Sequence, residues 1–241
     1  MENRKIIACL FVAFFLSIAV YAQSIYQKGS INYKKGKSEE AYIQIDFAYP
    51  QRFQNSITYI TPKSYKKFLK TGKIKNKMKQ KLKPKDIGGF SLDNGKVFKT
   101  VKYSDLTGKA LKMIPKKIVL EQITNGNVQM YKMYSRTTGK IPYELANLVM
   151  DSKTKGNQDL IDYIQNNFQL LIQKDSKNPK NVMHINLLNI IGDNAEVKEN
   201  YDNNFYGLRN QFTERQKMGK YVNKQYEASF LKMLNDYNGK S

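Results

Sequence analysis

Residues 123–134 read ITNGNVQMYKMY, and this stretch decides the predicted fold. The Asn125-Gly126 pair separates two runs of apolar and aromatic residues, and Asn-Gly tolerates the positive φ angles of a type I′ turn, so we predict a tight hairpin. The return strand would place Val128, Met130, Lys132 and Tyr134 on one face and Gln129, Tyr131 and Met133 on the other. Because both faces are partly apolar, we expect a central strand covered on both sides rather than a solvent-facing strip that grips a ligand.

The chain upstream of this hairpin has the same period-two pattern, from residue 24 to about residue 136. The run EEAYIQIDFAYP puts Ile43, Ile45 and Phe47 on one face, and the run NSITYITP reads as a strand closed by Pro62. A second Asn-Gly, at 94–95, predicts another type I′ hairpin. Antiparallel hairpins should therefore form a β-rich domain over residues 23–140.

Helical spacing of apolar residues dominates the remainder of the chain. We predict a mixed to helical region over residues 141–241 that packs on or follows the β part. Residues 141–158 read as a loop with one helical turn, and residues 157–174 fit either one helix or a helix followed by a strand over 168–174. The run INLLNIIGDN predicts a short helix stopped by Gly192. Apolar stripes then predict helices over 201–212 and 222–237, so the fold class is α+β.

The N-terminus has the pattern of a secretory signal peptide over residues 1–22. Arg4 and Lys5 precede a 15-residue apolar run at 6–20, and small residues stand before Gln23. A membrane helix needs roughly 20 apolar residues, which this run does not reach. We therefore expect export to the periplasm, the cell envelope or the extracellular space. Cys9, the only cysteine, lies inside this segment, so the mature chain would have no cysteine, disulfide or thiolate ligand.

The charge is strongly positive, at +21 for the whole chain. Such an excess favours anionic partners such as lipopolysaccharide, nucleic acid or an acidic glycan. Only five of the 41 basic residues are Arg, the residue that grips phosphate bidentately. A Lys-rich, Arg-poor composition is also what an AT-rich coding sequence produces, so composition and selection for anions both remain open.

One segment concentrates this charge: residues 63–85 hold eleven Lys and no acid. Every odd position from 73 to 85 is Lys, namely Lys73, Lys75, Lys77, Lys79, Lys81, Lys83 and Lys85. In an extended chain these side chains would project from one face, about 6.6 Å apart. The segment is then either a solvated strand that protects a sheet edge or a ribbon that follows a polyanion.

Two stretches, KPKDIGGFSLDNGKVF and VLEQITNGNVQMY, resemble segments of a group of uncharacterised secreted proteins of Bacteroidota. Those segments read Asp-Ile-x-Gly-Phe and Leu-Glu…Gly-x-Val-x-Leu-Tyr, with Met130 here in place of Leu. The closing Tyr237-Asn238 also resembles that group. The resemblance implies an exported protein with a β-rich N-terminal part, and it implies no activity. The Lys-rich segment departs from the group's pattern.

No motif for catalysis, metal binding or a cofactor stands out. His184 is the only histidine, and no Gly-x-Ser-x-Gly accompanies it. Residues 202–207, DNNFYG, resemble the start of a calcium loop, but Tyr206 occupies the fifth position and Thr213 stands where a bidentate Glu is required, so we interpret the run as a helix start.

The carboxylates of the β half share no spacing typical of an acid–base pair. The absence of Trp disfavours a stacking platform for sugars.

We therefore predict a non-enzymatic, exported envelope protein of structural or interaction type. A polyanion-binding module that uses residues 63–85 is the alternative, and a hydrolase with an unrecognised carboxylate pair is a distant third.

Overall fold

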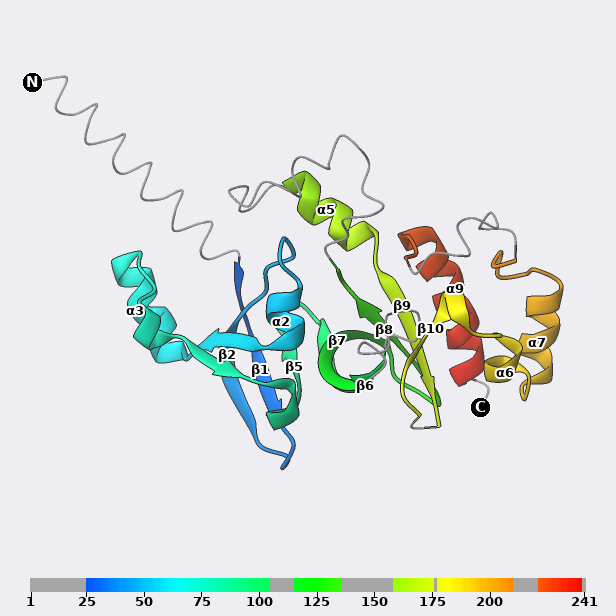
Figure 1. Ribbon diagram of the computed structural model, residues 1–241, viewed down its shortest axis with the longest axis horizontal. Coiled ribbons are helices and arrows are strands. Elements are labelled where there is room, and N and C mark those ends of the chain that lie inside the picture. The colour runs from blue at the N-terminus through cyan, green and yellow to red at the C-terminus, as the bar shows by residue number, and fades with distance from the viewer. Residues whose placement is uncertain (1–24, 105–114, 136–157, 176, 210–220, 240–241) are drawn as a thin grey trace, which may run out of the picture.

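The structure, a computed structural model, describes residues 25–104, 115–135, 158–175, 177–209 and 221–239. A ten-stranded antiparallel sheet runs through it in the order β10-β9-β8-β7-β6-β5-β1-β2-β3-β4 (Figure 1). The strands are β1 (Tyr26–Tyr33), β2 (Ser38–Gln44), β3 (Ile57–Ile60), β4 (Gln80–Leu82), β5 (Ile87–Leu92), β6 (Val97–Tyr103), β7 (Lys116–Thr124), β8 (Val128–Met133), β9 (Gln169–Lys174) and β10 (Lys180–Asn181).

The α-helices are α2 (Gln51–Asn55), α3 (Pro62–Thr71), α5 (Gln158–Asn166), α6 (Leu188–Ile191), α7 (Ala195–Asp202) and α9 (Lys224–Gly239). Short 3-10 helices are η1 (Asn76–Met78), η2 (Pro84–Asp86) and η4 (Val182–His184). The predicted α+β class is confirmed: hairpins fill the N-terminal and middle parts, and helices gather towards the C-terminal end. Two strands, β9 and β10, join the sheet from the region after residue 140.

The hairpin that joins β7 to β8 is present, and β8 is a central strand between β7 and β9. Val128 and Met130 are fully buried on one face, and Tyr131 is buried on the other, where Gln129 and Met133 are half-buried. The prediction of a central, largely buried strand is confirmed, but its second face is only partly covered. The turn geometry is different from the prediction, because Gly126 does not have a positive φ. Its lack of a side chain is needed for another reason: a Cβ there would lie 2.6–2.9 Å from the carboxamide of Asn238.

The Asn94-Gly95 hairpin is also present, but the predicted two-residue type I′ turn is wrong. Gly95 N–H donates to Leu92 O, and Leu92 N–H donates to Lys96 O, which closes a three-residue loop. Only Gly95 has a positive φ, of 87°, and Asn94 does not. This is a type I turn followed by a left-handed glycine, the usual three-residue alternative in hairpins.

Two helices interrupt the N-terminal strands, where the sequence pattern predicted none. In α3, the Thr61 side chain accepts a hydrogen bond from Ser64 N–H, Pro62 occupies the first turn, and Gly72 ends the helix at φ 63°. These are ordinary start and stop signals. The dense lysines after Pro62 masked the apolar stripe of Tyr65 and Phe68 that buries one side of this helix.

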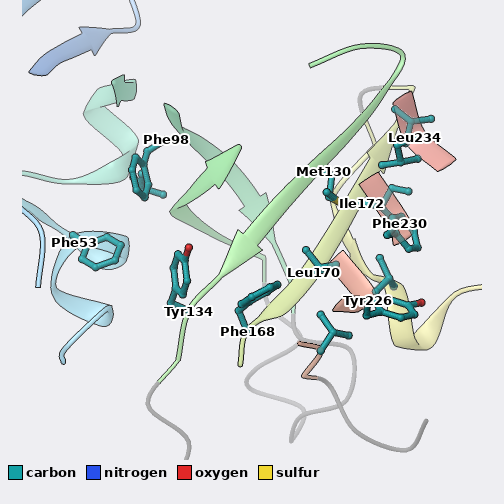
Figure 2. Packing of buried hydrophobic residues seen from close by; sticks show 14 of the residues in the cluster. Phe53, Phe98, Met130, Tyr134, Phe168, Leu170, Ile172, Tyr226, Phe230 and Leu234 are labelled. Atoms are coloured by element: carbon teal, nitrogen blue, oxygen red, sulfur yellow. The ribbon is translucent and has the colours of Figure 1, made fainter. Parts of the chain in front are cut away.

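The main core covers one face of the sheet from end to end, and we call this the helix-covered face. It includes Phe53 of α2, Ile164 of α5 and Phe230 of α9. Figure 2 shows aromatic rings at its centre, where Phe53, Phe98, Tyr134 and Phe168 lie between the two halves of the sheet. Edge-to-face contacts such as that of Phe53 with Phe98, at 6.0 Å between centroids, add to the burial of apolar surface.

The opposite face carries two smaller clusters. Under α3, Tyr26 and Ile60 pack with Tyr65, Phe68 and Met78. Farther along the sheet lies a second cluster, made of Val101, Tyr103, Ile118, Leu120, Tyr131 and Leu171. The sheet is therefore covered by α3 at one end of this face, and it carries an apolar patch on β6 to β9.

The C-terminal region resolves one open alternative and corrects another prediction. Residues 158–174 form a helix and then a strand, α5 and β9, rather than one helix. The short helix ended by Gly192 and the long helix with buried Tyr226, Phe230, Leu234 and Tyr237 are confirmed as α6 and α9. By contrast, the predicted helix over 201–212 is wrong where the structure describes it: α7 ends at Asp202, the DNNFYG run is not a helix start, and Asn204 has φ 57°.

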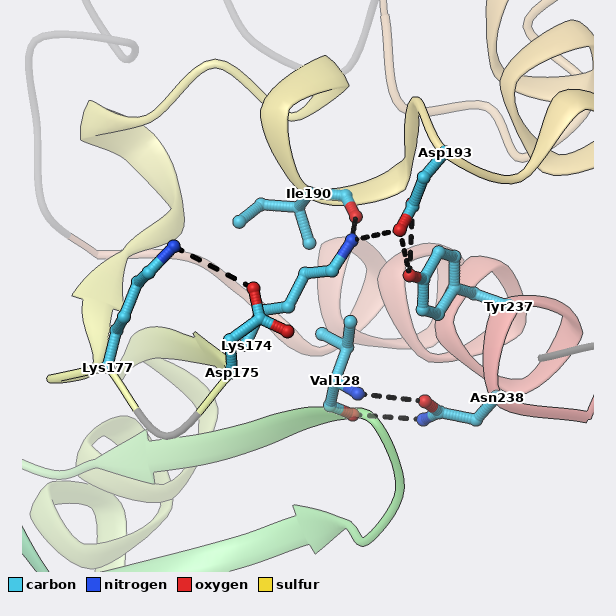
Figure 3. A network of polar contacts seen from close by, with 8 residues as sticks. All are labelled: Val128, Lys174, Asp175, Lys177, Ile190, Asp193, Tyr237 and Asn238. Atoms are coloured by element: carbon cyan, nitrogen blue, oxygen red, sulfur yellow. Dashed lines mark hydrogen bonds and ion pairs between the residues drawn. The ribbon is translucent and has the colours of Figure 1, made fainter.

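Side-chain amides attach two helices to the ends of β8. Asn238 of α9 accepts a hydrogen bond from Val128 N–H at 3.0 Å and donates one to Val128 O at 2.9 Å (Figure 3). At the other end, Gln54 of α2 makes the same pair of bonds with the backbone of Tyr134, at 2.9 and 2.7 Å. Each amide stands in for a neighbouring strand where the ladder ends, which satisfies buried backbone groups.

Several predictions fall outside the described residues: the signal peptide over 1–22, the loop over 141–157, the boundary near 140 and the helical run beyond 209. Within the described ranges, no helix has the length and apolar character needed to cross a bilayer.

Candidate anion-binding surface

The Lys-rich segment forms one edge of the sheet. It starts in α3, passes through η1, adds the last strand β4 beside β3, and ends in η2. All eleven of its lysines are exposed to solvent, and we call this set, Lys63–Lys85, the basic edge. Among the described residues, no salt bridge joins any of them to a carboxylate.

Local packing orients these side chains outwards. In α3, Tyr65 and Phe68 are buried against the sheet, which leaves the lysines on the helix's outer side. After Gly72, four of the six even positions are covered: Met78 and Pro84 are buried, and Ile74 and Leu82 are half-buried, whereas Asn76 and Gln80 are exposed. The odd positions, Lys73 to Lys85, are thereby left to the solvent.

The seven predicted anion-binding residues, Lys73, Lys75, Lys77, Lys79, Lys81, Lys83 and Lys85, therefore share exposure, but they do not form one straight row. The turns η1 and η2 interrupt the extended backbone, and only Lys81 lies within a strand. The predicted ribbon, with lysines evenly spaced by about 6.6 Å along one extended chain, is therefore wrong. What remains of the pattern is its alternation between anchored and exposed positions.

A convergence of charge that the sequence did not reveal lies beside η2. The Lys34 ammonium, at the end of β1, donates a hydrogen bond to Lys85 O. Contact with the Lys117 side chain lowers the pKa of Lys34, and loss of solvation is the second cause. The nearby Asp86 raises this pKa and so offsets the lowering only in part. Lys34, Lys85 and Lys117 come from three distant parts of the chain, so neither spacing nor periodicity could have brought them together. They extend the positive surface from the basic edge towards β7.

The remaining candidates for chemistry are dispersed or buried. His184 is exposed in η4. Glu121 is buried and already occupied, because its carboxylate accepts hydrogen bonds from Lys96 Nζ at 2.6 Å and from the Tyr134 hydroxyl at 2.5 Å. Burial and the neighbouring Glu121 raise the pKa of Tyr134. No group of three or more His, Cys, Asp or Glu side chains able to hold a metal occurs in the part of the chain that the structure describes.

A second buried ion pair fixes α9 on the sheet. Lys132 Nζ lies 2.6 Å from a Glu227 carboxylate oxygen and 4.4 Å from the centroid of the Phe168 ring. Both side chains are almost covered, at 11% and 14% exposed. This explains the one cation on an otherwise apolar face of β8, and the pair is too enclosed to meet a ligand.

A concave surface lies on the opposite face of the sheet, and no sequence pattern predicted it. It is a cavity of about 320 Å³ above strands β6 to β9, lined by Lys99, Gln122, Gln129, Tyr131, Gln173 and Asn178 among others. We call it the amide trough. Its lining includes polar side chains from β6, β7, β8 and β9.

Comparisons with known proteins gave no relative from which a function could be transferred: no family model, no curated protein and no solved structure matches this chain.

Proposed function

We propose that the chain is an exported, non-enzymatic interaction protein of the cell envelope, and that its basic edge binds an anionic polymer or surface. The observation that carries the proposal is that all eleven lysines between residues 63 and 85 are exposed, in a segment without a single acid. Like charges held this close together repel, and a polyanion relieves that repulsion while it releases its own counterions.

The chemistry of the side chains supports recognition of charge rather than of a particular group. Lysine is a compact, mobile point charge, whereas arginine binds carboxylate or phosphate in a fixed bidentate geometry. Because every charged residue of this edge is a lysine, the bound partner would be held without sequence or stereochemical specificity. The convergence of Lys34, Lys85 and Lys117 adds cations next to the same surface.

A competing explanation is that these lysines only protect a sheet edge. β4 is the last strand of the sheet, and exposed Lys on such a strand opposes pairing with another chain. The two explanations predict different affinities of the protein for polyanions, and a comparison of two matched variants distinguishes them.

The test compares two fourfold Lys→Gln variants of equal net charge on a heparin column eluted with rising salt. One variant changes Lys73, Lys75, Lys77 and Lys79 of the basic edge. The control changes Lys177, Lys180, Lys224 and Lys232, which are also exposed but lie on the C-terminal half. We expect the first to elute at clearly lower salt than the control. Equal elution of the two variants would show that retention follows net charge alone, and the basic edge would lose its role.

Export can be tested separately. If residues 1–22 are a signal peptide, the protein recovered from the envelope of a Gram-negative host should begin at Gln23, as measured by intact mass. A product that retains Met1 would contradict export while leaving the binding test unaffected.

A further inference from the structure

The amide trough has a floor and two walls. Strands β7, β8 and β9 form the floor, β6 forms one wall through Lys99, and the connection between β9 and β10 forms the other through Asn178. At about 320 Å³ the cavity is at the small end of the range of ligand sites, sufficient for one or two sugar rings. It belongs to the half of the sheet that ends at β10, while the basic edge lies beside β4 at the other end.

Three glutamines lie next to one another on the floor. Gln129 of β8 is paired directly with Gln173 of β9, and Gln122 of β7 reaches Gln129 Oε1 from the other side at 3.4 Å. The second bond of Gln122, to Asn125 Oδ1, is also 3.4 Å long. Bonds of this length are weak, so a ligand can replace them at little cost.

The hydrogen bonds of this cluster are incomplete. The Tyr131 hydroxyl lies against Gln129 Oε1 and, at 3.0 Å, against Gln173 Oε1, but it has one proton and can donate to only one of them at a time. Burial raises the pKa of Tyr131 to about 12, so the hydroxyl keeps that proton. Within the described residues, the amides of Gln129 and Gln173 contact only Tyr131 and Gln122, so most of their donors and acceptors are left for a ligand. The trough therefore offers neighbouring donors and a free acceptor, the pattern that the hydroxyl groups of a sugar complement.

Charge at the trough has one sign. Lys99 and Lys102 line it, no carboxylate does, and Lys99 has no salt bridge within the described ranges. We propose that the amide trough binds a saccharide that carries an acidic group, with the glutamine amides on its hydroxyls and Lys99 on its carboxylate, sulfate or phosphate. Recognition here uses hydrogen bonds and one cation, so it does not need the tryptophan platform that the chain lacks.

This site goes beyond the proposed function and is independent of it. It lies on a different surface, it is selective rather than general for anions, and it involves none of the basic edge. Both lysine variants keep the trough intact, so failure of the trough proposal would leave the difference between them on heparin unchanged. A failed test of the basic edge would likewise leave the difference between the trough variant and its control unchanged.

The experiment is calorimetric titration of the full chain with oligosaccharides bearing uronate, sulfate or phosphate, each beside its neutral counterpart. Tetragalacturonate and its methyl ester form one such pair. The trough variant is Gln129→Ala with Gln173→Ala. Its control is Gln27→Ala with Gln44→Ala, which changes two half-exposed glutamines on the neighbouring strands β1 and β2. Lys99→Gln tests the cation.

We expect at least one acidic oligosaccharide to bind the wild type and the control equally, and the trough variant about tenfold more weakly. Lys99→Gln should weaken the acidic ligand about fivefold and leave its neutral counterpart unchanged. Thermal unfolding of each variant shows whether it folds, and Gln173→Glu provides a second probe, because a carboxylate in the trough should repel the same ligand. Absence of binding across the series, equal binding of acidic and neutral partners, or equal loss in trough and control variants would each overturn the proposal.

Discussion

Gly126→Ala tests how the C-terminal helix is attached to the central strand. The three atoms nearest to a Cβ at position 126 all belong to the Asn238 carboxamide, at 2.6–2.9 Å, so the added methyl must displace that amide. Displacement breaks the two hydrogen bonds of Asn238 with Val128. At about 0.5–1.5 kcal/mol each, the loss is about 1–3 kcal/mol. Replacing Gly also restricts the unfolded chain, which returns about 0.4–1 kcal/mol. The net destabilisation should be about 1–2 kcal/mol.

Urea denaturation measures this, and a double-mutant cycle isolates its cause. Asn238→Ala alone should also destabilise by about 1–3 kcal/mol, since it removes the same two bonds. In that background the methyl of Gly126→Ala meets no amide, so the substitution should become neutral or stabilising. Gly239→Ala is the control, because a Cβ there meets no atom within 4 Å. If the two changes add within about 0.5 kcal/mol, the clash with Asn238 is not the reason for glycine at this position.

Two further predictions concern charged pairs. Glu227→Gln leaves Lys132 buried without a counter-charge and should lower the free energy of unfolding in urea by about 3–5 kcal/mol. Asp202→Asn breaks an exposed pair on α7 and should lower it by less than about 1 kcal/mol. Similar losses in the two variants would contradict the role assigned to burial. The hydrogen bond from Lys174 lowers the pKa of Asp193 below its ordinary 3.8, so Asp193 stabilises the fold at neutral pH and this contribution is lost as the pH falls through its folded pKa. The stability gap between wild type and Asp193→Asn should therefore close in acid, and a gap that is constant with pH would refute the linkage.

Local patterns predicted the fold wherever one signal dominated. The alternation in residues 128–134 identified β8 as a central, largely buried strand, and the fourfold spacing from Tyr226 to Leu234 identified α9. The helix α3 was missed because its dense lysines hid the apolar stripe of Tyr65 and Phe68, although Thr61, Pro62 and Gly72 carried the helix signals. The role of Gly126 also differs from the predicted one. A side chain at this position is excluded by Asn238, a residue from the far end of the chain.

The candidate sites divide in the same way. The basic edge could be found from sequence, because its lysines lie within one continuous segment and its buried positions are apolar. The amide trough could not, since Gln122, Gln129 and Gln173 are unremarkable surface residues until the register of β7, β8 and β9 places them side by side. The convergence of Lys34 with Lys117 likewise depends on the path of distant strands. The register between strands that are distant in the chain cannot be predicted from a single sequence.

The most direct test of the central claim is the salt dependence of polyanion binding at equilibrium. Binding of a fluorescent DNA duplex of arbitrary sequence, measured by anisotropy, gives the slope of log K against log of the salt concentration. Each lysine that contacts a phosphate contributes about 0.9 to the magnitude of this slope. We predict that Lys→Gln at Lys73, Lys75, Lys77 and Lys79 lowers it by about 1–4, while the control change at Lys177, Lys180, Lys224 and Lys232 leaves it within about 0.5. An unchanged slope in the first variant, or the same decrease in both, would contradict the assignment of anion binding to the basic edge.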